Sequence, residues 1–191
     1  QTTPPPRSRK KVLAENGPAA DVLAGPRVTA TRDILNIGVI GYGYWGPNLV
    51  RNFSELTDAR VHTVADLSPK ALETVARRYP ATKTTTDAMA MIRDPEIDAV
   101  AIATPVATHF SLAMAALKAG KHVWLEKPMT ETSMQARALV EEADKRGLTL
   151  HVDHTFVYTG PVKKMRELVR NCDLGKALYF DSQRVNLGLF Q

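Results

Sequence analysis

Short apolar runs alternate along the chain with longer stretches in which apolar residues recur every three or four positions. The runs are typical of buried strands, and the recurring positions are typical of amphipathic helices. Ile97–Ala103 is apolar except for Asp98, as expected of a central parallel strand covered on both faces. The other predicted strands are 37–40, 61–65, 82–86, 123–125 and 148–152. This alternation predicts an α/β fold built on a doubly wound parallel sheet, the Rossmann fold.

Polar residues in front of the helical stretches predict where those helices begin. Ser68 and Asp87 each precede a helical pattern, and their side chains can accept a hydrogen bond from a free N–H of the first turn. Thr132 and Gln135 have the spacing of a capping box. Gly120 follows a helical pattern and is predicted to close that helix in the left-handed conformation.

The two ends of the chain lack this alternation. Residues 1–35 combine prolines with a basic cluster and no sustained period, which predicts a disordered extension. Residues 36–156 are the predicted dinucleotide-binding Rossmann domain, and 157–191 are predicted to begin an incomplete α+β substrate and oligomerisation domain. That second part should hold a helix opened by Pro161, with Val162, Met165, Leu168 and Val169 facing inward, and a long strand at 178–190.

Charge and composition narrow the class of partner. The net charge of the 191 residues is +5, and residues before Ile37 carry +3 of it, from six basic and three acidic side chains. This arm has no interleaved aromatic residues and no nucleic-acid-reading motif, so we expect no nucleic-acid partner. No run reaches the roughly 18 apolar residues of a membrane span, and a cytoplasmic protein is expected. The single Cys172 excludes an intrachain disulfide and a cysteine-based zinc site, and no metal is predicted.

A glycine-rich stretch follows the first predicted strand. Gly41 would allow a tight turn, Gly43 would let the backbone approach a pyrophosphate, and Gly46 would let the helix pack close to the strand. The helix N-terminus would then face the phosphates with free N–H groups. Glycines can also simply punctuate a turn. Here a strand precedes, a helix follows, and Asp66 ends the next strand about twenty residues on, which favours a bound dinucleotide.

The residues after the second strand favour NAD over NADP. Asp66 can accept hydrogen bonds from the adenosine ribose hydroxyls, and its charge would repel a 2′-phosphate. Leu67 and Ser68 supply no cation for such a phosphate, although Lys70 or Arg77 could approach. Alternatively, Asp66 is only a turn residue.

Three motifs together resemble the Gfo/Idh/MocA oxidoreductases, the family of glucose-fructose oxidoreductase and inositol dehydrogenase. They are G-Y-G-Y-W-G at 41–46, A-T-P-x-x-x-H at 103–109 and E-K-P at 126–128, and the resemblance covers residues 36–191. It implies that Lys127 is the catalytic residue, beside the nicotinamide and hydrogen-bonded to the hydroxyl being oxidised. A residue before proline is held extended, and an ammonium fixed there can stabilise developing negative charge.

The resemblance also implies the other cofactor contacts. Thr104, Pro105 and His109 would line the nicotinamide half, and Glu126 would lie near the nicotinamide ribose. The complete predicted set of cofactor-binding residues is Gly41, Gly43, Tyr44, Trp45, Gly46, Asp66, Leu67, Thr104, Pro105, His109, Glu126, Lys127 and Pro128.

Several of these residues also allow a structural interpretation. Tyr44 and Trp45 could pack under the sheet edge instead of facing a ligand. His109 could be a helix-surface histidine. Glu126 could be a cap or part of a surface ion pair, and a lone Lys127 would be a solvated loop residue.

The implied activity is transfer of hydride between nicotinamide and a ring hydroxyl or ketone of a sugar, cyclitol or nucleotide sugar. Two alternatives remain, an NAD-retaining glycoside hydrolase of the same family and a non-catalytic dinucleotide-binding module. An S-adenosylmethionine methyltransferase also uses a glycine-rich turn, but the E-K-P motif speaks against it.

The acid/base histidine of the family is not found in this sequence. Its D-x-x-x-H pair is absent after residue 154, and the same spacing at Asp58 to His62 leads into the second strand. His154 could reach the site from the end of the sixth strand, but a linker role is favoured. We therefore expect this histidine beyond Gln191, and a homo-oligomer for the full-length form.

Overall fold

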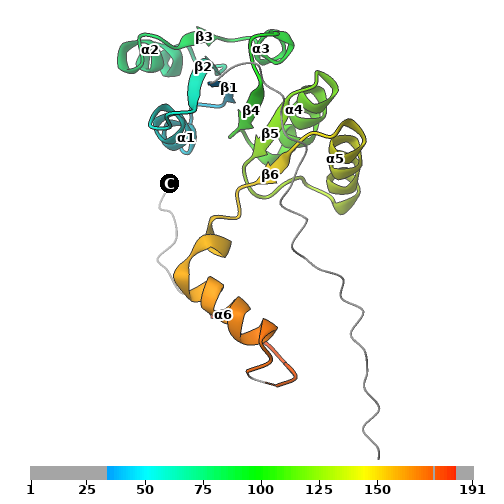
Figure 1. The fold of residues 1–191 in the computed structure, drawn as a ribbon. Coiled ribbons are helices and arrows are strands. Elements are labelled where there is room, and N and C mark those ends of the chain that lie inside the picture. The colour runs from blue at the N-terminus through cyan, green and yellow to red at the C-terminus, as the bar shows by residue number, and fades with distance from the viewer. Residues whose placement is uncertain (1–33, 174, 184–191) are drawn as a thin grey trace, which may run out of the picture.

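One parallel sheet organises the chain. The computed structural model describes residues 34–173 and 175–183, and the strand order is β3-β2-β1-β4-β5-β6 (Figure 1). The strands are β1 (Leu35–Ile40), β2 (Ala59–Ala65), β3 (Lys83–Thr85), β4 (Ala99–Ile102), β5 (His122–Leu125) and β6 (Leu150–Val152). The helices are α1 (Gly46–Ser54), α2 (Pro69–Arg78), α3 (Ala88–Arg93), α4 (Val106–Lys118), α5 (Ser133–Arg146), the 3-10 helix η1 (Thr155–Tyr158) and α6 (Gly160–Arg170).

Helices cover both faces of the sheet, so the prediction of a doubly wound fold is confirmed. One core lies under α1 and α2 and contains Val50 and Val75, and the other lies under α3, α4 and α5 and contains Leu117 and Leu139. Figure 1 shows α1 and α2 on one side of the sheet and α4 and α5 on the other. The middle of the predicted central strand, residues 100–102, is completely buried.

The predicted helix starts are confirmed. Ser68 Oγ accepts a hydrogen bond from Ala71 N at 3.4 Å, and Asp87 Oδ1 accepts one from Ala90 N at 2.8 Å. Thr132 Oγ1 accepts one from the backbone N–H of residue 135 at 3.3 Å.

The prediction of a complete capping box is wrong, because only one of its two hydrogen bonds forms. Within the described part of the chain, Gln135 Oε1 is buried without a hydrogen-bond partner and does not reach back to Thr132. The helix end predicted at Gly120 is confirmed, because α4 ends at Lys118 and Gly120 has a φ of +77°.

The segment after β6 differs from the sequence prediction. The helix opened by Pro161 forms as α6, but none of its residues is buried, and Met165 and Val169 are 46% and 55% exposed. Figure 1 shows α6 apart from the sheet, so its apolar face has no layer of the described chain to pack against. The inward orientation predicted for Val162, Met165, Leu168 and Val169 is therefore wrong for the described part of the chain.

The predicted strand at 178–190 does not form in its described part, residues 178–183. A strand needs a neighbour for its backbone hydrogen bonds, and the described residues contain a single sheet that does not extend to this segment. The remainder of that prediction, and almost all of the predicted extension at 1–35, lie outside the described residues. Among the helices described, none combines the length and apolar character needed to cross a membrane.

Candidate functional site

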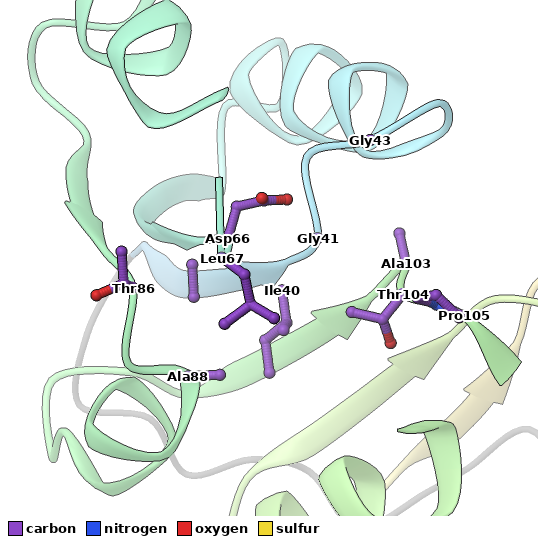
Figure 2. Close-up of a pocket in the computed structure, with 11 residues that line it drawn as sticks. Ile40, Gly41, Gly43, Asp66, Leu67, Thr86, Ala88, Ala103, Thr104 and Pro105 are labelled. Atoms are coloured by element: carbon purple, nitrogen blue, oxygen red, sulfur yellow. The ribbon is translucent and has the colours of Figure 1, made fainter. Parts of the chain in front are cut away.

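Two adjoining cavities lie along the carboxyl ends of the strands. The first, of about 250 Å³, lies between the glycine turn after β1, the end of β2 and the end of β4 (Figure 2). The second, of about 640 Å³, continues over the ends of β5 and β6. Both are lined by Gly43, Ala103, Thr104 and Pro105, so they form one trough. The trough crosses the β1–β4 junction, where the strand order reverses, which is the usual ligand position in such sheets.

The three glycines differ in what surrounds them. Gly41 has a φ of +94°, and a Cβ there would lie 2.6 Å from Ala103 O, so both backbone conformation and space require glycine. A Cβ on Gly46 would collide with the carbonyl oxygen of Gly41, which closes the turn against the start of α1. A Cβ on Gly43 would meet nothing within 4 Å. Gly43 therefore leaves the space open that a pyrophosphate needs, in front of the N-terminus of α1.

Asp66 connects the glycine turn to the end of β2. Its Oδ2 accepts a hydrogen bond from Tyr42 N at 2.6 Å, and its Oδ1 accepts one from Ser68 N at 2.7 Å. A carboxylate has about four acceptor positions, so two remain for ribose hydroxyls. Leu67 is 88% exposed and lines the first cavity beside Asp66 (Figure 2). Among the described residues that line this cavity, none is a lysine or an arginine.

The second cavity brings together aromatic and charged side chains. Tyr44 and Trp45 are 80% and 38% exposed at its rim, so neither is packed away under the sheet edge. Lys127 is exposed on the opposite wall, and the Lys127–Pro128 peptide is cis. Lys127 also lines a third cavity of about 550 Å³ that includes His154 and Pro128. His154, Phe156 and Lys127 thus lie around neighbouring spaces.

His109 lies behind the wall of the trough and does not line it. Its side chain is 1% exposed, and its Nδ1 and Nε2 are each 2.9 Å from a carbonyl oxygen, that of Pro128 and that of Thr104. Because both partners are acceptors, both hydrogen bonds form only when both ring nitrogens carry a proton. His109 therefore joins the two loops that carry Thr104 and Lys127, and it is not a helix-surface histidine.

Glu126 is buried beside Asp153, a residue that the sequence analysis did not single out. The two side chains are 8% and 7% exposed. Burial raises the pKa of Glu126 from its ordinary value of 4.5 to about 7, with further increases from the hydrogen bond and negative charge of Asp153, while Lys127 acts in the opposite direction. Glu126 is thus neither a cap nor a surface ion pair. Asp153 directly follows a predicted strand, as Asp66 does. This position at the end of a strand could have identified Asp153 as a candidate site residue from the sequence.

A second group of polar residues lies at the opposite edge of the sheet. His62, Asp94 and Glu96 have ligand atoms within 4.8 Å of one another. Lys83 Nζ lies 3.3 Å from Glu96 Oε2 and 3.4 Å from His62 Nε2, so an ammonium already supplies the positive charge in this group. His62 lies in the middle of β2 and lines a separate cavity with Arg60 and Lys83, so the spacing from Asp58 carries no catalytic meaning.

Comparisons with known proteins agree with this geometry. The model of the Gfo/Idh/MocA family, described as an oxidoreductase family with an NAD-binding Rossmann fold, matches residues 35–154. Myo-inositol 2-dehydrogenase of Thermotoga maritima is 30% identical over 142 residues, which are 74% of this chain and 42% of that protein. The scyllo-inositol 2-dehydrogenase (NADP(+)) IolW of Bacillus subtilis is 28% identical, over 72% of this chain and 38% of that protein.

A solved structure shares the same architecture. Biliverdin reductase from Synechocystis sp. PCC 6803, in complex with biliverdin and NADP+, has a TM-score of 0.66 and 30% sequence identity. The alignment covers 71% of this chain and 43% of that one. The chain thus spans less than half the length of the relatives that it matches.

Proposed function

The chain belongs to the Gfo/Idh/MocA family of oxidoreductases, and from this premise we propose that it binds NAD and moves hydride between nicotinamide and a ring hydroxyl or ketone of a sugar, cyclitol or nucleotide sugar. The observation that carries the proposal is the trough, which joins the open glycine turn and Asp66 at one end to Lys127 at the other. When bound, the nicotinamide supplies the hydride chemistry, and the chain supplies binding, orientation and proton handling.

The residues present fit a dinucleotide. The space over Gly43 is free, two acceptor positions of Asp66 remain, and the second cavity extends the trough far enough for a second nucleoside half. We propose Gly41, Gly43, Gly46 and the start of α1 for the pyrophosphate, and Asp66 with Leu67 for the adenosine ribose. Thr104, Pro105, Glu126 and Pro128 would hold the nicotinamide half, with Tyr44 and Trp45 at the rim.

The absence of a lysine or arginine from the described lining of the first cavity supports NAD over NADP. A 2′-phosphate there would face the Asp66 carboxylate without a compensating cation. One relative carries NADP(+) in its name and one similar structure contains NADP+, so a direct comparison of the two dinucleotides decides the preference of this chain.

Lys127 is proposed to hold the substrate oxygen. Its exposed ammonium projects from the end of β5 into the second cavity, and it can donate a hydrogen bond to a hydroxyl placed there. As hydride leaves the carbinol carbon, negative charge develops on that oxygen, and a fixed ammonium stabilises it more than it stabilises the neutral alcohol. Tyr44, Trp45 and Phe156 border the same cavity and would limit access of water.

A ligand titration followed by a turnover assay tests this proposal. NAD+ or NADH should raise the unfolding temperature and change tryptophan fluorescence, since Trp45 lies at the rim, whereas S-adenosylmethionine should do neither. The variant Lys127→Met should retain NADH binding and lose hydride transfer to a panel of cyclitols, sugars and nucleotide sugars. Failure of both dinucleotides to bind would overturn the proposal. Binding without any turnover by the unmodified chain would instead support a non-catalytic module.

A further inference from the structure

We propose that Glu126 and Asp153 form a proton-sharing acid pair whose net charge sets the relative affinity of this chain for oxidised and reduced nicotinamide dinucleotide. The inference rests on the proposed function, because it concerns the nicotinamide end of the same trough. It assigns a task to Asp153, which belongs to none of the three sequence motifs, and it predicts a proton linked to the redox state of the ligand.

The pairing of β5 with β6 brings the two carboxyl groups together. Asp153 N donates a hydrogen bond to Leu125 O at 2.9 Å, so Asp153 and Glu126 leave neighbouring strands at the same level of the sheet. Glu126 N in turn donates to Ile102 O at 3.0 Å, which fixes the backbone on its other side. Ionising two neighbouring buried carboxyl groups is unfavourable because their negative charges repel each other. Sharing one proton removes this repulsion.

The pair faces the trough and is not sealed in the core. Glu126 and Asp153 line the 640 Å³ cavity together with Lys127. Glu126 Oε1 is buried and has no hydrogen-bond partner among the residues that the structure describes. A buried polar atom of this kind requires an explanation, and a ligand group in the adjoining cavity supplies one.

The charged and titratable groups around the pair come from three segments. Lys127 follows Glu126 directly, His154 follows Asp153 and lines the third cavity, and Tyr44 lies at the rim of the second. Burial and the proximity of Asp153 place the pKa of Glu126 at about 7, against the opposing effect of Lys127. The pair therefore gains negative charge at Glu126 as the pH rises through neutrality.

The two redox forms of the ligand differ in charge only at the nicotinamide. With the adenosine ribose held at Asp66 as proposed, the nicotinamide would extend past Thr104 along the cavity that the pair lines. The oxidised ring is a cation, and the reduced ring is neutral. The negative charge that Glu126 gains consequently strengthens binding of NAD+ more than that of NADH. By reciprocity, NAD+ binding near neutral pH displaces part of the shared proton.

Equilibrium binding by the full 191-residue chain tests this without any catalytic assay. Kd values for NAD+ and NADH would be measured from about pH 6 to about pH 8, and calorimetry in two buffers of different ionisation enthalpy would report proton release. The ratio of Kd for NADH to Kd for NAD+ should rise by roughly tenfold over this interval, equivalent to about 1.4 kcal/mol. Proton release should accompany binding of NAD+ and not of NADH.

Two variants and one control make the result specific. In Glu126→Gln the titrating carboxyl is gone, so the ratio should be flat and proton release should vanish. In Asp153→Asn the repulsion between the two carboxylates is gone, so the rise in the ratio of Kd for NADH to Kd for NAD+ should occur at lower pH. Glu141→Gln, which removes an exposed carboxylate on α5 outside the trough, should behave as the unmodified chain does.

The outcomes separate the two proposals. If the unmodified chain binds neither dinucleotide, the proposed function fails. If both bind but the ratio is independent of pH, or the same pH dependence persists in a folded Glu126→Gln or Asp153→Asn variant, only the acid-pair inference is overturned. Thermal unfolding of each variant would establish that it is folded, and either variant alone suffices for the decision.

Discussion

The backbone N–H of Tyr42 donates a hydrogen bond of 2.6 Å to the carboxylate of Asp66. This bond connects the glycine turn after β1 to the end of β2, across the parallel pairing of the two strands. The carboxylate proposed to hold the adenosine ribose therefore also holds the turn proposed to hold the pyrophosphate. Stability and cofactor affinity should be coupled at this residue.

Replacing Asp66 with alanine should affect both properties. The turn loses its charge-assisted hydrogen bond, and we expect the free energy of unfolding to fall by about 1.5–3 kcal/mol, measured by urea denaturation. Affinity for NAD+ should fall, and the preference over NADP+ should narrow because the repulsive charge is gone. Glu73→Ala, at an exposed position on α2, is the control and should change stability by less than about 0.5 kcal/mol. An unchanged ratio of the two affinities would contradict the proposed ribose contact.

Gly43 and Gly46 offer a matched pair of substitutions. Gly43→Ala adds a methyl group where nothing lies within 4 Å, so stability should stay within about 0.5 kcal/mol while dinucleotide affinity falls at least tenfold. Gly46→Ala places the same group against the carbonyl oxygen of Gly41 and should destabilise the fold by about 2 kcal/mol or more. Urea denaturation and NADH titration separate the two effects. Equal NADH affinity for Gly43→Ala and the unmodified chain would exclude a phosphate over Gly43.

The alternation of strands and helices and the glycine turn could be predicted from sequence because each depends on local patterns. Ile97–Ala103 is apolar except for Asp98 and contains the buried centre of the sheet, and Gly41 is followed by a helix at the expected distance. The exposure of the apolar face of α6 could not be predicted in this way. Its amphipathic pattern indicates that one face should be covered, but the pattern does not show that the covering surface lies outside the described residues.

The relation between distant residues at the site was equally hard to predict. Glu126 and Asp153 meet only because β5 pairs with β6, and that neighbour relation is a property of the sheet and not of either segment. His109 has the motif spacing expected of a residue that faces the cofactor, yet its side chain is directed to two backbone carbonyls behind the trough. A motif indicates which residues belong to a site, whereas packing decides which of them can touch a ligand.

His109 should stabilise the fold and position Lys127 without touching the ligand. His109→Leu removes the ring nitrogens that lie 2.9 Å from the carbonyl oxygens of Pro128 and Thr104, and should cost about 1–3 kcal/mol of unfolding free energy. The glutamine side chain of His109→Gln can donate a hydrogen bond to one of these oxygens. The unfolding free energy of this variant should therefore lie between those of His109→Leu and the unmodified chain. In both variants turnover should decline more than NADH affinity, because the loop of Lys127 moves while the glycine turn does not.

Ser111→Ala provides a control on the same helix, since the Ser111 hydroxyl donates only to Thr108 O within α4 and the side chain is exposed. It should leave stability and turnover unchanged. An equal loss of NADH affinity and turnover in His109→Leu would contradict the positioning role and indicate direct contact with the dinucleotide.

The raised pKa of Glu126 should make the fold less stable as the pH rises toward neutrality. The carboxyl titrates at about 7 in the folded chain and at its ordinary 4.5 when unfolded, so between these values the folded state binds more protons. The free energy of unfolding then decreases with pH. This stabilisation is fully present below 4.5 and is lost as the pH passes about 7.

Stability curves of the unmodified chain and of Glu126→Gln, measured in urea from about pH 4.5 to about pH 8, would reveal this contribution as a difference of about 1–3 kcal/mol. The two curves have to be subtracted because His122 affects the pH dependence of stability in the opposite direction. Burial lowers the pKa of His122 from 6.5, so its contribution increases stability as the pH rises. His122 is present in both proteins and cancels. Parallel curves would show that Glu126 ionises normally in the fold, and would also remove the charge change on which preferential binding of NAD+ depends.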